Sequence, residues 1–76
     1  MTLKECRRNI HLSVDELGEM LGITGRAVRT YEDGTREPGA ETILKMAAVY
    51  NLPAEDILRM ILAAEERYKN RKRRKP

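Results

Sequence analysis

Arg26, Arg29 and Thr30 stand within residues 25–30, a stretch that contains no acidic residue. In a helix, Val28 would point inward and leave these three polar side chains on the outer arc. A guanidinium group can donate two hydrogen bonds to O6 and N7 of guanine, and Arg26 is the best candidate for such a contact. The same residues would also suit a charged helix face that is simply solvated. The helices that carry them distinguish these two interpretations.

The other reactive side chains do not assemble a catalytic site. The single cysteine, Cys6, falls on an apolar stripe with Leu3 and Ile10, which predicts a small buried core residue. The single histidine, His11, lies in a connection and has no partner at metal-ligand spacing. Since the carboxylates are scattered and no glycine-rich phosphate loop is present, we expect no enzyme activity, metal, cofactor or identifiable small-molecule ligand.

Start and stop signals mark the helices that would carry the arginines. Ser13 and Glu16 have the spacing of a capping box, and Gly22 can end the helix that they begin. Thr24 can cap the next helix, which Gly34 would stop. Two short helices joined by a tight turn form the helix-turn-helix pattern.

Three further helices are predicted around this unit. Residues 2–10 begin with another capping box and carry an apolar stripe. After a loop rich in turn formers at residues 33–39, a helix is predicted over residues 40–50, and Pro53 opens a last, long helix. The predicted fold class is all-α: a compact five-helix domain with an extended C-terminal helix.

Charge is divided unevenly along the chain. Residues 1–66 hold 8 Lys and Arg against 12 Asp and Glu, whereas residues 67–76 hold 7 basic residues and no acid. We therefore expect a helix-turn-helix domain over residues 1–66 and a basic C-terminal tail over residues 67–76. The tail alone is unspecific, because basic segments bind DNA, RNA and anionic membranes.

Chain length and the distribution of apolar residues indicate the size of the domain and its relation to membranes. The 76 residues are expected to form one domain near the lower size limit for a self-contained core. No apolar run approaches the ~20 residues of a membrane span, and no signal-peptide segment is evident. With one cysteine, the chain fits a reducing compartment, so we expect a cytoplasmic protein without a membrane partner.

A long, ordered set of residues carries a family resemblance. It comprises Leu3, Cys6-Arg7, Leu12-Ser13, Glu16-Leu17, Leu21-Gly22-Ile23-Thr24, Val28, Tyr31-Glu32-x-Gly34, Arg36-x-Pro38, Glu41-Thr42-Ile43-Leu44-x-Met46-Ala47 and Asn51-Leu52-Pro53-x-Glu55-Asp56-Ile57-Leu58. Over roughly residues 3–58 the chain resembles the DNA-binding domain of the Xre/Cro, lambda-repressor-like helix-turn-helix regulators. The resemblance implies a repressor-like transcription regulator that binds double-stranded DNA and inserts the helix over about residues 25–33 into the major groove.

The resemblance also implies roles for individual positions. It assigns base reading to Gly25, Arg26, Ala27, Arg29 and Thr30. It assigns contacts with the DNA backbone to Ser13, Val14, Gly34 and Arg36. It further implies a structural ion pair between Arg7 and Glu32.

Three residues depart from the family pattern. Val14 replaces a glutamine that commonly touches the DNA backbone, so a phosphate contact there is weakened or relies on backbone N–H groups. Gly18 replaces an alanine at a cost of ~1 kcal/mol in helix propensity, which would allow close approach of the two helices of the motif. Gly25 replaces a larger polar residue, so one base contact is missing.

Five consecutive apolar residues at 60–64 cover more than one face of a helix. A homodimer with Met60, Ile61 and Leu62 in its interface is the favoured interpretation, and the alternative is that this helix folds back on its own domain. Two other functions stay open. One is an antitoxin-type or accessory module that captures a protein partner through this helix, and the other is non-specific RNA binding through the tail.

Overall fold

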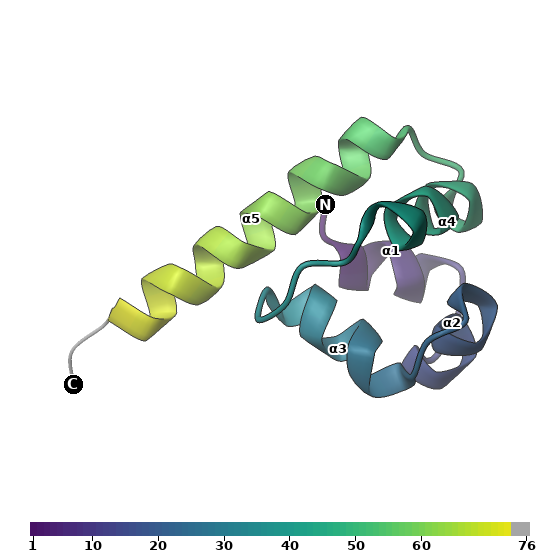
Figure 1. The fold of residues 1–76 in the computed structure, drawn as a ribbon, viewed down its shortest axis with the longest axis horizontal. Coiled ribbons are helices and arrows are strands. Elements are labelled where there is room, and N and C mark those ends of the chain that lie inside the picture. Colours follow the sequence, from purple (N-terminus) through teal and green to yellow (C-terminus); the bar gives the residue numbers. More distant parts are fainter. Residues whose placement is uncertain (74–76) are drawn as a thin grey trace.

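The computed structural model describes the backbone of residues 1–73 and the side chains of residues 1–72. Its five helices are α1 (Leu3–Asn9), α2 (Val14–Leu21), α3 (Gly25–Asp33), α4 (Ala40–Tyr50) and α5 (Ala54–Arg73), as shown in Figure 1. No strand occurs in this part of the chain, so the predicted all-α fold of five helices is confirmed. Within the same residues, no helix is both long enough and apolar enough to cross a membrane.

Local hydrogen bonds set the starts of α2 and α3 where the sequence predicts them. Ser13 Oγ accepts a hydrogen bond from the Glu16 N–H at 3.0 Å, and Glu16 Oε1 accepts one from the Ser13 N–H at 2.8 Å. Thr24 Oγ1 accepts a hydrogen bond from the Ala27 N–H at 3.0 Å. Gly22 ends α2 in the left-handed conformation, with φ 75°. Because each cap joins residues close in sequence, these boundaries are encoded locally.

An aliphatic core joins all five helices. The largest side chains that are less than 2% exposed come from α2 to α5, and they are Leu17, Leu21, Val28, Met46, Ile57 and Ile61. From α1, Leu3 and Cys6 join the same cluster. The buried position predicted for Cys6 is therefore confirmed, and burial raises the pKa of its thiol.

Gly18 lets α2 pack directly on the turn that leads into α3. A Cβ at this position would lie 2.7 Å from the Ile23 carbonyl oxygen and 3.0 Å from the Gly25 nitrogen. These neighbours are backbone atoms, which cannot rotate away as a side chain can. The close approach of the two helices expected at Gly18 is thus present, and it fixes the angle at which α3 leaves the turn.

The first half of α5 belongs to the core, whereas its second half extends past the rest of the domain (Figure 1). Met60 and Ile61 are 8% and 1% exposed, but Leu62 is 61% exposed. The interpretation of these three residues as one partner surface is therefore corrected for Met60 and Ile61, whose side chains fill the domain's own core.

The helix also continues across the predicted boundary between domain and tail. Residues 67 to 73 extend α5 without interruption, so this part of the predicted tail is a continuation of the last core helix. The remainder of the predicted tail, residues 74–76, lies outside the described residues.

Candidate nucleic-acid interface

The outer face of α3 presents two cations to solvent. Arg26 and Arg29 are exposed, Ala27 and Thr30 are half-buried, and Val28 is fully buried on the inner side. The Thr30 hydroxyl donates to the Ala27 carbonyl at 2.7 Å, which leaves its oxygen lone pairs available as acceptors. Among the described residues, neither Arg26 nor Arg29 forms an ion pair, so both guanidinium groups retain their donors for a ligand.

Gly25 does not join this face. It is buried, and a Cβ added to it would overlap the Asp15 carboxylate from α2. The Asp15 backbone nitrogen would also lie only 3.1 Å from that Cβ. The assignment of Gly25 to base reading is therefore corrected: the glycine makes room for α2, and its own surface is covered.

An ion pair joins α1 to α3 on the side away from Arg26. Arg7 Nε lies 2.8 Å from Glu32 Oε2, and Arg7 Nη2 lies 3.2 Å from Glu32 Oε1. A third donor, Arg7 Nη1, binds the Leu12 carbonyl at 2.9 Å. The two side chains are only 10% and 6% exposed. The hydrogen bonds to Glu32 raise the pKa of Arg7, so the pair stays charged and holds α3 at a set distance from α1.

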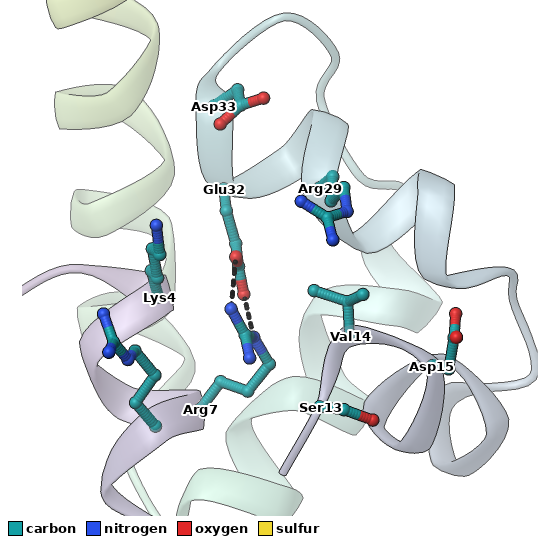
Figure 2. Close-up of a pocket in the computed structure, with 9 residues that line it drawn as sticks. Lys4, Arg7, Ser13, Val14, Asp15, Arg29, Glu32 and Asp33 are labelled. Carbon is teal, nitrogen blue, oxygen red and sulfur yellow. Dashed lines mark hydrogen bonds and ion pairs between the residues drawn. The ribbon is translucent and has the colours of Figure 1, made fainter.

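A groove of about 520 Å³ opens between α1, the start of α2 and α3. Figure 2 shows Lys4 beside the Arg7–Glu32 pair, with Arg29 above Val14 on the opposite wall. The full lining is Lys4, Arg7, Arg8, Ser13, Val14, Asp15, Arg29, Glu32 and Asp33. Arg7 and Glu32 neutralise each other, and the remaining walls carry three cations and two carboxylates, which leaves a net formal charge of +1.

The start of α2 supplies backbone donors to the same groove. The capping box occupies the Ser13 N–H as a donor, whereas Ser13 Oγ only accepts from the Glu16 N–H, so the Ser13 O–H is still free to donate to a ligand. The N–H groups of Val14 and Asp15, in the first turn, have no hydrogen-bond partner within residues 1–73. An apolar side chain at Val14 therefore does not remove the possibility of a phosphate contact, because a helix N-terminus binds anions through its backbone.

The turn after α3 is organised around a single carbonyl. The N–H groups of Gly34, Thr35 and Arg36 point to the Thr30 oxygen at 3.1, 3.0 and 3.4 Å. Gly34 is also buried, so the assignment of its N–H to a DNA phosphate is corrected: that donor is already used inside the turn. The Arg36 side chain is exposed beyond the end of α3 and remains available.

Lys4 was not singled out from the sequence, yet it lines the groove. Its position four residues before Arg8 is the signal that could have identified it, since residues i and i+4 share a helix face. Asp15 was also missed, because its contact with Gly25 depends on how α2 crosses α3. The residues that the structure describes hold no group of three or more His, Cys, Asp or Glu placed to bind a metal ion.

Comparison with known proteins gives a consistent pattern. A family model described as helix-turn-helix matches residues 3–57. An uncharacterized HTH-type transcriptional regulator of Bacillus subtilis (strain 168), YqaE, is 32% identical over 57 residues, which is 75% of this chain and 49% of that protein. Similar regulators of Sinorhizobium medicae (strain WSM419) and Rhizobium meliloti (strain 1021) are each 36% identical over 47 residues, or 62% of this chain and 34% of theirs.

The chain thus spans between about a third and a half of the length of these relatives. No solved structure gives a significant match.

Proposed function

Because the chain belongs to the helix-turn-helix family, we propose that it is a sequence-specific DNA-binding transcriptional regulator whose α3 enters the major groove. The observation that carries this proposal is the outer face of α3, where Arg26 and Arg29 are exposed and free of ion pairs among the described residues. The relatives' description as HTH-type transcriptional regulators supports the same class.

Two kinds of contact would divide the work. Arg26, Arg29 and Thr30 would meet base edges, with Ala27 available for a thymine methyl group. The groove beside Lys4 and the α2 N-terminus would receive a phosphate, which positions the protein without reading sequence. Arg29 lies on the outer face of α3 and also lines the groove, so one docked duplex would make base contacts and phosphate contacts together.

A repressor-like action follows from occupancy, because a bound domain excludes other proteins from the same DNA. Paired domains would read half-sites about one helical turn, ~34 Å, apart. Leu58 and Leu62 are 43% and 61% exposed and share one side of α5, which supports pairing through this side. Analytical ultracentrifugation of the chain and of Leu62→Glu tests it: we expect a dimer that the substitution dissociates, and a monomer at high micromolar concentration would contradict pairing.

Selection from random-sequence duplex pools tests the proposed function as a whole. We expect the chain to enrich a defined motif, and an inverted repeat would report a dimer. The Arg26→Ala/Arg29→Ala double variant should enrich none, while Lys69→Gln serves as a control with a charge removed away from α3. Failure of the chain itself to enrich any motif, together with co-purification of one stoichiometric protein, would favour the accessory-module alternative.

A further inference from the structure

The turn that follows α3 touches α5 main chain to main chain. Gly34 adopts a left-handed conformation, with φ 84°, and a Cβ there would overlap the Ala64 carbonyl group. The Glu65 nitrogen is also close, at 2.8 Å from the same Cβ position. Since no side chain separates the two backbones, α5 crosses the C-terminal end of α3 at a fixed place. Everything in α5 after residue 65 lies beyond that crossing.

One side of α5 changes from apolar to basic residues at this crossing. Before it, Ile57, Ile61 and Ala64 are buried against the core and recur at helical spacing. Residues three and seven positions after Ala64 lie on the same side of a helix, and these are Arg67 and Arg71. Both are exposed, and neither forms an ion pair among the described residues. The stripe that faces the core therefore continues as a stripe of cations.

A half-buried tyrosine supports this basic stripe. Lys72 Nζ lies 5.7 Å from the centre of the Tyr68 ring, a cation–π distance that holds the lysine along the helix. The second half of α5 extends past the domain as a straight helix (Figure 1). Cations in its last turns also complement the negative end of the helix dipole, which favours the helical state despite their mutual repulsion.

We propose that Arg67 and Arg71, supported by Lys72, form a helical arm that contacts phosphates of the duplex flanking the bound site. This inference rests on the proposed function, because it requires a duplex seated on α3. The proposal requires that the duplex flanking the bound site pass the C-terminal end of α3 on the side of α5 that carries Arg67 and Arg71. Charge complementarity selects the phosphate backbone as the partner, and such contacts add affinity without base preference.

A matched pair of substitutions tests the arm. Lys69 lies two residues before Arg71, about 200° around the helix, so it occupies the opposite side. Arg71→Gln and Lys69→Gln each remove one positive charge from the same turn. With DNA selected by the unmodified chain, we expect Arg71→Gln, and likewise Arg67→Gln, to reduce the slope of log K against log salt by about 0.9. Lys69→Gln should leave the slope unchanged, and equal effects at all three positions, or none, would overturn the proposal.

A second pair separates a positioned helix from a loose basic segment. Asn70→Pro retains every charge but interrupts α5 before Arg71, whereas Asn70→Ala retains the helix. The proline variant should lose the same part of the salt slope as Arg71→Gln, and the alanine variant should behave as the unmodified chain. An unchanged slope in Asn70→Pro would overturn the proposal. Thermal unfolding of each variant, followed by circular dichroism, checks that the domain core remains folded.

The length of the DNA provides an independent readout. Extending the selected motif by one helical turn on either side should increase the affinity of the unmodified chain and increase it less for Arg67→Gln/Arg71→Gln. No gain from any extension would overturn the arm while leaving the proposed function intact. Conversely, failure to select a motif at all would refute the proposed function, and equal binding to single-stranded RNA of the same length would refute the duplex as the arm's partner.

Discussion

Arg7 and Glu32 are 25 positions apart in sequence, yet they form a two-point ion pair that ties α1 to the end of α3. Both side chains are almost fully buried, at 10% and 6% exposed, so water solvates either charge poorly. Removing one member would leave the other buried and unpaired, which costs more than the pair itself contributes.

Glu32→Ala is therefore expected to lower the free energy of unfolding by about 3 kcal/mol. The Arg7→Met/Glu32→Leu double variant should lose less than either Glu32→Ala or Arg7→Ala, because it leaves no uncompensated charge. Urea denaturation at 25 °C measures the three variants against the unmodified chain. A loss near zero for Glu32→Ala would contradict a structural role for the pair.

Arg26→Ala should relax base preference at one base pair, by about 1–3 kcal/mol of discrimination. Arg36→Ala is the matched comparison, since it removes the same charge beyond the end of α3. We expect it to weaken binding to all sequences equally and to lower the salt slope by about 0.9. Binding-site selection followed by titration with single-base variants measures both effects, and an unchanged preference in Arg26→Ala would remove it from base reading.

Asp15 and Gly25 are expected to be energetically coupled. In the unmodified chain, Gly25→Ala forces the Asp15 carboxylate out of its place, so it should destabilise the fold. In an Asp15→Ala background the same substitution should destabilise the fold less, because only the backbone nitrogen of residue 15, at 3.1 Å, remains close to the added Cβ. A double-mutant cycle by thermal or urea unfolding measures the coupling, expected at about 0.5–3 kcal/mol. The same sign and size in both backgrounds would show that the contact carries no energy.

Tyr50→Phe is expected to increase stability at pH 7. The Tyr50 hydroxyl is buried and has no hydrogen-bond partner among the described residues, and its removal relieves a cost of about 1 kcal/mol. Burial raises the pKa of Tyr50 above its usual 10.0, so the folded state resists ionisation that the unfolded chain undergoes. Stability should thus fall as the pH rises above about 10, and less steeply in Tyr50→Phe.

Thermal unfolding between pH 7 and pH 11 measures this difference. The raised pKa of Cys6 adds a separate decline above about pH 9, so Cys6→Ala serves as the control that isolates it. Identical pH profiles for Tyr50→Phe and the unmodified chain would contradict the assignment to Tyr50.

Features encoded over three or four residues could be predicted from the sequence, and features set by helix crossings could not. The capping box of Ser13 and Glu16 needs only its own neighbours, so its spacing sufficed. The apolar run after Arg59 indicated that surface is buried, but periodicity does not say whether the partner is the same chain. Only the packing of α5 decides that Met60 and Ile61 face inward.

The residues of the candidate site also separate into those predicted from their own helix and those that depend on other helices. Arg26, Arg29 and Thr30 follow from the position of the buried Val28 on their own helix. Gly25 and Gly34 were misassigned because their neighbours come from other helices, Asp15 from α2 and Ala64 from α5. A glycine in a motif indicates either a closely packed neighbouring segment or a positive φ. The sequence does not identify which segment packs against it.

The backbone contact between the Gly34 turn and Ala64 involves no side chain on the outer face of α3, and the turn binds Thr30 through its backbone carbonyl. Exchanging the side chains at positions 26, 29 and 30 therefore leaves the seating of the helix unchanged. For protein engineering, this makes the chain a scaffold in which recognition can be randomised at three positions. Position 34 must stay glycine in such a library, since any other residue would change how the helix is held as well as what it contacts.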